Sequence, residues 1–253
     1  MSLRLKALGL HVHELPALEL RALTPARAVP LPQAYDLVVF VSRYAAQRYL
    51  QLLAEAPSAP SRWPAATLAA TVGASSARAL FGFVPPECIV HPPADTAAQD
   101  SESLLAILLD CKVPLRRVLI VRGTQGRPWL ANALTERGAQ VDFLAVYERV
   151  PATWAPGAMQ ALSSALEQPA HCVFLLTSSE GVAAIAARLR EHGLLAQWGK
   201  AAFVVIHERI GTTLQSVLAS QPDDGVRRLE LCMPDDDSIV QAVHAVARST
   251  AKP

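Results

Sequence analysis

The two halves of this chain repeat the same elements in the same order, and this repeat limits the fold more than any single motif. A strand-like run that ends at Ser42, DLVVFVS, returns as CVFLLTS ending at Ser178, 136 positions later. Two further matches, a strand with its turn and a helix start, lie at Gly73 and His207 (offset 134) and at Asp100 and Asp237 (offset 137). A repeat of this length is a whole domain, so the sequence predicts two similar lobes with a cleft between them. Clefts commonly hold ligands.

Runs rich in valine and leucine alternate with stretches of helical periodicity. The runs begin near Val12, Leu37, Ala69, Val118, Val141, Val173, Phe203 and Leu229. Strands buried on both faces lose the alternation of apolar and polar residues, and helices between such strands carry the chain across a parallel sheet. We therefore expect an α/β protein with two similar flavodoxin- or Rossmann-like lobes and parallel sheets. Helix ends are predicted at C-cap glycines, Gly138 and Gly193, and helix starts at N-cap aspartates, Asp100 and Asp237.

Two strand-like runs, Val12 to Leu23 and Val141 to Val150, have no counterpart in the repeat. They lie at the two ends of the first copy. If they pair, they form a two-stranded β ladder, and the first lobe is an insertion into the second. We then expect a discontinuous lobe of residues 1–18 plus 150–253 and an inserted lobe of residues 19–149.

Composition excludes several classes of protein. A net charge of +1 lacks the broad basic surface of a nucleic-acid binder. The apolar runs have the length of strands, far short of the roughly 20 residues of a membrane helix, and the N-terminus has no uninterrupted signal-peptide core. We expect a cytoplasmic monomer. The four cysteines are widely spaced and no histidine pair has metal-ligand spacing, so we expect reduced thiols and no metal site.

The segment from Val118 to Val150, VLIVRGTQGRPWLANALTERGAQVDFLAVYERV, carries the clearest sign of a ligand site. Its first strand ends at Arg122-Gly123, and a turn leads through Arg127 into a helix. Glycines let the main chain approach a ligand, and a helix start offers free N–H groups to an anion. An ordinary β–α turn with a solvated Arg127 fits the same residues equally well. A nucleotide-binding enzyme is disfavoured, because the chain contains no GxGxxG and no complete Walker sequence.

This segment, together with DLVVFVS, FLLTSSEGV, VGASSARAL and the helix start at Asp100-Ser101, resembles the uroporphyrinogen-III synthase family. The similarity runs from about Leu5 to the C-terminal helix. It implies two α/β lobes, the first inserted into the second, joined by a two-stranded ladder. It also implies a cofactor-independent hydro-lyase of porphyrin and haem biosynthesis. Such enzymes close hydroxymethylbilane, a linear tetrapyrrole with eight carboxylates, to uroporphyrinogen III, losing water and inverting ring D through a spirocyclic intermediate.

The resemblance implies roles for particular residues. Tyr147 matches a tyrosine near the cleft and is our candidate for a general acid or an orienting hydrogen-bond donor, although a tyrosine merely packed in its strand would give the same pattern. Hydroxyl side chains at strand-to-helix turns are candidates for substrate binding, or are simply helix caps: Ser42, Ser76, Ser101 and Ser178. Arginines that can grip carboxylates complete the predicted site: Arg43, Arg122, Arg127 and Arg209.

The chain departs from the family pattern at three places. Arg43 and Tyr44 follow Ser42 where proline and asparagine are usual, and His207 to Ile210 replaces a turn that often ends in threonine. The chain also starts within the helix that matches LRLKALGL, so we expect the first strand of the discontinuous lobe to be missing, with reduced or absent activity if the chain is complete. An alternative function is therefore a weak or inactive two-lobed module that binds tetrapyrroles.

Overall fold

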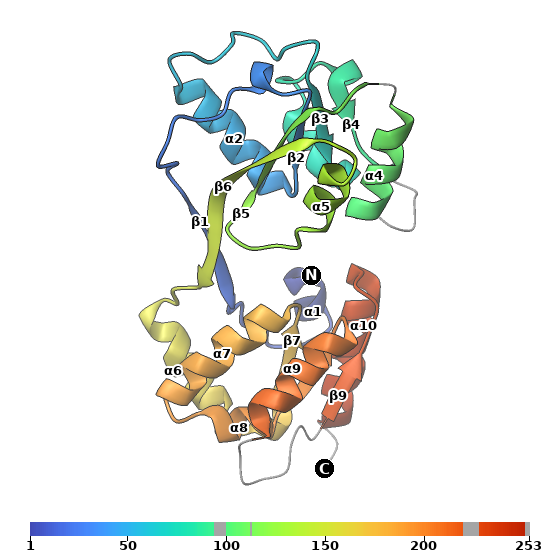
Figure 1. The fold of residues 1–253 in the computed structure, drawn as a ribbon. Helices are drawn as coiled ribbons and strands as arrows, with labels where there is room; N and C mark the ends of the chain where they lie inside the picture. Colours follow the sequence, from blue (N-terminus) through green and yellow to red (C-terminus); the bar gives the residue numbers. More distant parts are fainter. Residues whose placement is uncertain (94–99, 112, 220–227, 251–253) are drawn as a thin grey trace. The chain divides into compact units, whose positions relative to one another are not determined.

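The computed structural model describes residues 1–93, 100–111, 113–219 and 228–250. The chain divides into two compact units (Figure 1): unit 1 comprises Met1–Glu19 and Val150–Pro253, and unit 2 comprises Leu20–Arg149. It passes from one unit to the other twice, within strand β1 (Leu18–Ala22) and within strand β6 (Gln140–Pro151).

Strands β1 and β6 are neighbours and run antiparallel. The main-chain N–H of Leu23 donates to the carbonyl of Val146, and the N–H of Ala152 donates to the carbonyl of Ala17. Partner numbers fall along β6 as residue numbers rise along β1, which is the pattern of an antiparallel ladder. The predicted two-stranded ladder is therefore present.

Unit 2 is built on a sheet with the strand order β1-β6-β5-β2-β3-β4. Its other strands are β2 (Leu37–Phe40), β3 (Leu68–Thr71), β4 (Ile89–Val90) and β5 (Arg117–Gly123). All contacts among β2 to β6 are parallel. The helices are α2 (Arg43–Glu55), α3 (Ala74–Ala77), α4 (Ser101–Asp110) and α5 (Trp129–Thr135), with short 3-10 turns at Pro32–Ala34, Arg78–Leu80 and Pro86–Cys88.

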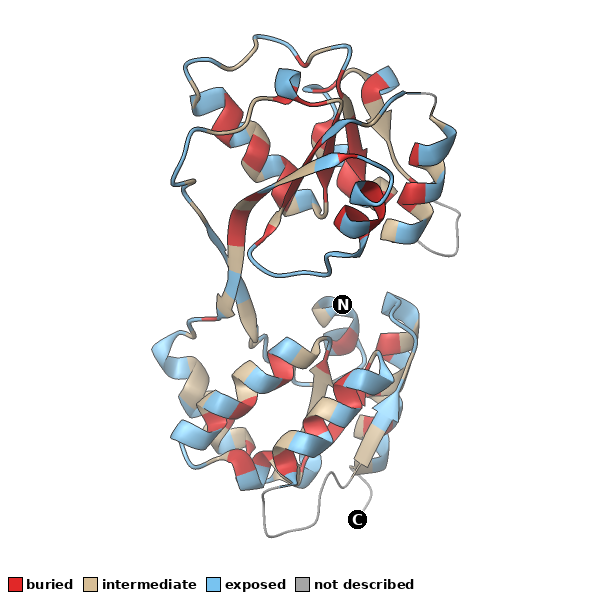
Figure 2. Cartoon of the chain, in the orientation of Figure 1, coloured by how far each residue is buried: buried red, intermediate tan, exposed pale blue. Residues whose placement is uncertain are grey.

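Strand β2 explains why its sequence is an uninterrupted apolar run. Val38 and Phe40 pack on one face of the sheet in the core cluster that includes Tyr49 of α2. Leu37 and Val39 pack on the other face, with residues of α4 and α5. Helices thus cover both faces of this sheet, and β2 is buried along its whole length (Figures 1 and 2). Each such side chain contributes about 1.5–3 kcal/mol when fully buried.

Unit 1 repeats this layered arrangement around a smaller sheet. Its parallel strands lie in the order β7 (Val173–Leu176), β8 (Ala202–Val205) and β9 (Arg228–Leu231). Its helices are α1 (Ser2–Ala7), α6 (Pro156–Ala165), α7 (Ser179–Glu191), α8 (Leu195–Gly199), α9 (Glu208–Leu218) and α10 (Asp236–Thr250), with a 3-10 turn at Pro169–His171. Phe203 and Val205 pack against α7 to α9, whereas Ala202 and Val204 pack against α1 and α10.

The predicted glycine caps are confirmed. Gly138 and Gly193 have φ of +90° and +69°, in the left-handed region that glycine enters without steric cost. Past each glycine a main-chain N–H reaches back to the helix, from Ala139 to the carbonyl of Leu134 and from Leu194 to that of Leu189. These are the six-to-one bonds of Schellman caps.

One strand prediction is wrong in its extent. The run predicted as a strand from Val12 to Leu23 forms a strand only from Leu18 to Ala22. Val12 is instead a half-buried residue packed against the core cluster that contains Val204 and Val243. Its apolar character reflects burial against a core rather than pairing in a sheet.

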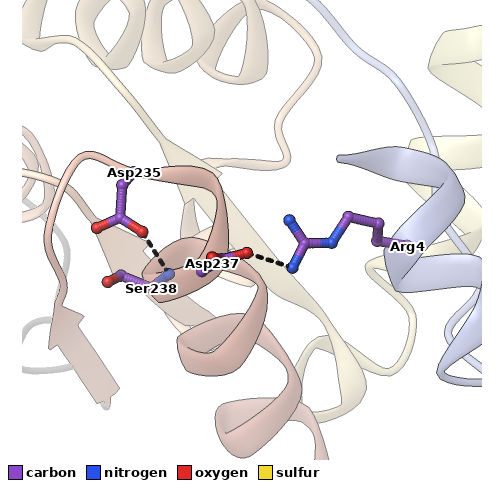
Figure 3. A network of polar contacts seen from close by, with 4 residues as sticks. All are labelled: Arg4, Asp235, Asp237 and Ser238. Carbon is purple, nitrogen blue, oxygen red and sulfur yellow. Dashed lines mark hydrogen bonds and ion pairs between the residues drawn. The ribbon is translucent and has the colours of Figure 1, made fainter.

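The predicted cap of the last helix is also wrong by two residues. An Oδ1 atom of Asp235 accepts the main-chain N–H of Ser238 at 2.9 Å, whereas Asp237 lies in the first turn of α10 and pairs with Arg4 at 2.6 Å (Figure 3). A capping side chain must precede the helix to reach a free N–H two or three residues on, and Asp237 is already inside it. With Asp235 as the cap, the offsets of the repeat agree more closely. Asp100 and Asp235 are 135 positions apart, between the offsets 136 and 134 of the other two pairs.

Candidate active site

The parallel strands β2, β3 and β5 end at the same edge of the unit 2 sheet, which we call the carboxyl edge. Ligands of open α/β sheets bind outside this edge, where helices begin and loops leave the strands. Ser42 follows β2 as the N-cap of α2, Gly73 follows β3 as the N-cap of α3, and the loop that starts at Thr124 follows β5. Tyr147 lies beside this loop on β6, opposite Gly123.

Tyr147 is held in place through both its ring and its main chain. The residue is only 4% exposed, and its hydroxyl oxygen lies 3.3 Å from Oγ of Ser42. The ring of Tyr44 meets it edge-on, with ring centres 5.3 Å apart. The main-chain carbonyl of Tyr147 accepts the N–H of Thr124 at 2.9 Å. A buried tyrosine with a hydrogen-bonded hydroxyl is well placed to present that hydroxyl in one direction.

A β-bulge sets which residue of β6 faces the end of β5. The register pairs Arg122 with Ala145 and then Gly123 with Tyr147, so Val146 is skipped. Bulges of this kind re-aim side chains and are common beside active sites. Gly123 is required for space, because a Cβ atom there would lie 2.8 Å from Cε2 of Tyr147.

Tyr147 also lines a shallow recess at the carboxyl edge. The other residues of its lining are Gly123, Thr124, Gln125 and Arg149. Tyr147 and Arg149 are two positions apart on β6, so their side chains leave the strand on the same side. The recess is therefore lined by a tyrosine and an arginine of β6 together with the last residue of β5 and the first two residues of the loop after it.

The predicted Arg122 packs against this loop. Its Nε donates to the carbonyl of Gly123 at 3.1 Å, and its guanidinium carbon lies 5.5 Å from the ring centre of Phe143. Gly126 makes room for it, since a Cβ atom there would lie 2.7 Å from Nη2 of Arg122.

The predicted Ser101 begins α4, and the predicted Arg127, in the loop before α5, reaches the first turn of α4 with its side chain. Nη1 of Arg127 is 3.6 Å from Oε1 of Glu102, and Ser101 is the half-buried first residue of the helix. Asp100 caps this helix as predicted, accepting the main-chain N–H of Ser103 at 2.9 Å. That hydrogen bond lowers the pKa of the Asp100 carboxyl, and the charge of Arg127 lowers it further.

The predicted Arg43 and Ser76 connect two helix starts. Nη2 of Arg43 donates to the carbonyl of Ser75 at 3.1 Å, which ties the first turn of α2 to α3. Ser76 is buried within α3, and its main-chain N–H donates to Gly73.

The remaining predicted residues, Ser178 and Arg209, lie in unit 1. Oγ of Ser178 accepts the main-chain N–H of Gly181 at 3.0 Å and caps α7, just as Oγ of Ser42 accepts the N–H of Ala45 at 3.1 Å and caps α2. His207 caps α9 through Nδ1, which accepts the main-chain N–H of Arg209 at 3.1 Å. The matched serines of the two halves of the repeat, Ser42 and Ser178, therefore both serve as helix caps.

The sequence analysis missed Tyr44 as a ring neighbour and Arg149 as a lining residue of the recess. Tyr44 lies two positions after Ser42, and Arg149 stands within the quoted segment from Val118 to Val150, two positions after Tyr147. The two-residue periodicity of a strand could have linked Arg149 to Tyr147. The β-bulge that places Tyr147 and Arg149 at the end of β5 has no recognisable pattern in the sequence.

Within the described parts of the chain, no three histidine, cysteine or acidic side chains gather into a group that could hold a metal ion. All four cysteines are free thiols, Cys88 buried and the other three half-buried. Among the helices of residues 1–93, 100–111, 113–219 and 228–250, none is long and apolar enough to cross a membrane.

The fold defines an α/β protein, and the strand ends and helix starts of its carboxyl edge form a candidate ligand site. The family model described as uroporphyrinogen-III synthase HemD matches residues 1–219. The chain therefore belongs to the uroporphyrinogen-III synthase family, as the sequence predicted. This membership makes it an enzyme of tetrapyrrole synthesis, of the lyase class.

Solved structures of the same kind share the fold. The chain is similar to a mutant uroporphyrinogen III synthase from the extremely thermophilic bacterium Thermus thermophilus, with 18% identity, a TM-score of 0.52, and 100% of this chain and 94% of that one covered. It is also similar to uroporphyrinogen-III synthetase from Helicobacter pylori, with 15% identity, a TM-score of 0.55, and 89% and 88% covered. The predicted α/β fold class is confirmed.

Proposed function

We propose that this chain closes hydroxymethylbilane to uroporphyrinogen III and that Tyr147 assists the departure of the hydroxyl group. The observation that carries this proposal is the position of Tyr147, a residue at the carboxyl edge whose hydroxyl lies within hydrogen-bond distance of Ser42. The Tyr147 hydroxyl transfers its proton to the leaving oxygen as the carbon–oxygen bond breaks, so water departs, and the phenolate regains a proton when the last pyrrole is restored. The hydroxyl of Ser42, 3.3 Å away, supports the negative charge that develops on the phenolic oxygen.

The later steps require positioning more than further acids or bases. The substituted carbon of ring D attacks the methylene carbon that has lost water, which gives a spirocyclic intermediate. One carbon–carbon bond then breaks and another forms, and loss of a proton restores the aromatic pyrrole. The overall reaction is a loss of water without net oxidation or reduction, so we propose that it proceeds without a cofactor. Holding the chain in the reactive geometry can contribute about 7–11 kcal/mol.

We propose that the substrate carboxylates are bound by the predicted arginines and serines. Those of unit 2 are Ser42, Arg43, Ser76, Ser101, Arg122 and Arg127; those of unit 1 are Ser178 and Arg209. Helix starts support this, because their positive ends and the N–H groups that no cap occupies attract anions. We also propose that the two lobes comprise residues 1–18 plus 150–253 and residues 19–149. A monomeric state, a cytoplasmic location and the lack of a nucleic-acid partner stay predictions.

The test is to give purified protein freshly prepared hydroxymethylbilane, oxidise the products and resolve the isomers by chromatography. We expect isomer III. Isomer I alone, formed at the spontaneous rate, would show that the chain does not catalyse this reaction.

The role of Tyr147 is tested by Tyr147→Phe, for which we expect kcat to fall by about 10²–10⁴-fold, the usual contribution of a general acid. Tyr35→Phe is the matched control. It removes a hydroxyl that donates to Asp142 at 3.0 Å at the opposite, amino end of the sheet. A loss of kcat equal in both variants would remove Tyr147 from the mechanism.

A second candidate function is a tetrapyrrole-binding module without turnover. His207 favours it, because its imidazole occupies the main-chain N–H of Arg209 at the start of α9. This N–H is then not available to a substrate carboxylate. Tight binding of uroporphyrin by a protein that makes no isomer III would identify this function.

A further inference from the structure

The arginines around Tyr147 differ in whether the protein itself satisfies them. Arg43 donates to the carbonyl of Ser75, Arg122 donates to the carbonyl of Gly123, and Arg127 pairs with Glu102. Within the part of the chain that the structure describes, the side chain of Arg149 has neither a hydrogen bond nor an ion pair. Its five N–H donors are therefore available to a ligand.

The acidic residue that precedes Arg149 in the sequence does not pair with it. Glu148 leaves β6 on the opposite side, because successive side chains of a strand alternate. There its Oε1 accepts Nε and Nη2 of Arg21 on β1, at 2.7 and 2.6 Å. Asp142, the other acid of β6, accepts the hydroxyl of Tyr35 at 3.0 Å. The acids of this strand are thus engaged elsewhere, and Arg149 keeps an uncompensated positive charge.

The position of Arg149 relative to Tyr147 follows from the end of β5. Gly123, the last residue of β5, pairs with Tyr147, so Arg149 lies beyond the part of β6 that pairs with β5. The recess places it with Thr124 and Gln125 of the loop after β5. Among the described residues, no hydrogen-bond acceptor is found for the main-chain N–H of Gln125 or Gly126. The guanidinium of Arg149 and these two main-chain N–H groups are donors, so a ligand that satisfies them is an acceptor such as a carboxylate.

We propose that Arg149 is a substrate-binding residue that grips one carboxylate of the tetrapyrrole next to Tyr147. A guanidinium holds a carboxylate through two parallel hydrogen bonds, which fixes both distance and orientation. The pyrroles of the proposed substrate carry their carboxylates on short flexible arms. Anchoring one arm at Arg149 selects which ring lies against the Tyr147 hydroxyl. This inference rests on the proposed function and adds a specificity-determining residue to it.

The experiment measures binding of uroporphyrin III, a stable ring with the same carboxylate arms, to the full chain by fluorescence titration. Arg149→Ala is expected to raise the Kd by about 10–100-fold, the effect of losing a hydrogen bond to a charged group. Arg149→Lys keeps the charge but loses the paired geometry, so we expect a smaller rise. Salt screens the attraction between the guanidinium and the carboxylate, so raising the salt concentration is expected to bring the Kd of the unaltered protein closer to that of Arg149→Ala.

Arg190→Ala is the matched control, because Arg190 is an exposed arginine of α7 in unit 1. We expect it to bind like the unaltered protein. The melting temperature of each variant separates loss of binding from loss of folding, and Arg149→Gln gives a second variant of similar size. A Kd of Arg149→Ala within twofold of the unaltered protein would overturn the proposal, as would an unaltered protein that does not bind uroporphyrin.

The same variants distinguish this inference from the proposed function. If the unaltered protein makes isomer III and Arg149→Ala matches it in KM and in isomer ratio, the carboxylate site is refuted and the function stands. If the unaltered protein makes no isomer III but Arg149→Ala weakens uroporphyrin binding, the site stands and the catalytic function is refuted. If both hold, we expect Arg149→Ala to raise KM more than it lowers kcat, because the carboxylate contact exists before the reaction starts.

Discussion

The hydroxyls of Ser42 and Tyr147 lie 3.3 Å apart, and this contact joins the end of β2 to β6 across the intervening strand β5. The same Oγ of Ser42 accepts the N–H of Ala45 as the cap of α2. One side chain therefore fixes the start of a helix and the direction of the tyrosine hydroxyl. Stability and activity should be coupled at this residue.

Ser42→Ala is expected to lower the free energy of unfolding by about 0.5–2 kcal/mol, as loss of a cap does. It should also lower kcat, because Tyr147 loses the group that orients its hydroxyl. Asp235→Ala is the control, since it removes a cap in unit 1, where Asp235 accepts the N–H of Ser238. Urea denaturation and kcat are measured for both. An equal kcat in the two variants would show that Ser42 acts only as a cap.

Gly123→Ala is expected to displace the ring of Tyr147, because the new Cβ atom would lie 2.8 Å from its Cε2. Crowding of this kind costs about 1–3 kcal/mol. Gly157→Ala is the control, as a Cβ atom at Gly157 meets nothing within 4 Å. Stability is measured by urea denaturation.

A double-mutant cycle separates displacement of the Tyr147 hydroxyl from general loss of structure. In Tyr147→Phe the ring remains and the crowding persists, but the hydroxyl is gone. We expect Gly123→Ala to lower kcat in the unaltered protein and to change it little in the Tyr147→Phe background. Equal losses in both backgrounds would mean that Gly123 supports the fold alone.

The sequence predicts the elements that burial dictates and misses the geometry that only the folded sheet creates. The sequence of β2 is an apolar run because helices cover both of its faces, so this strand was predictable. The cap of α10 was not, because Asp235, Asp236 and Asp237 are consecutive and each could cap. The place of Arg149 in the recess depends on the register shift between Arg122 and Gly123. No residue type in the sequence predicts this bulge.

The two aspartate caps predict a loss of stability in acid. Hydrogen bonds from main-chain N–H groups, of Ser103 to Asp100 and of Ser238 to Asp235, lower the pKa of each carboxyl below its ordinary value. Because the folded-state pKa is the lower one, this stabilisation is complete above the unfolded value of about 4 and is lost as pH falls through the folded value. The free energy of unfolding should therefore decline below about pH 4.

The double variant Asp100→Asn with Asp235→Asn tests this assignment. Asparagine still caps a helix through its carbonyl oxygen but does not titrate. We expect the variant to show a shallower decline in the free energy of unfolding, measured by urea denaturation from neutral pH down to about pH 3, below the ordinary pKa of an aspartate. A decline identical to that of the unaltered protein would assign the acid sensitivity to other groups.

His207 is an unusual helix cap, and it predicts that unit 1 can be stabilised by one substitution. Its Nδ1 accepts the N–H of Arg209 only two residues on, whereas Ser178 reaches the third residue on, Gly181. Serine, aspartate and asparagine are the preferred caps, and a negative charge also favours the positive end of the helix. His207→Asp should therefore raise the melting temperature at neutral pH. His192→Asp, at the opposite end of a helix as the C-cap of α7, should not, because a negative charge there opposes the helix dipole. If both substitutions shift the melting temperature alike, the imidazole of His207 has no capping role.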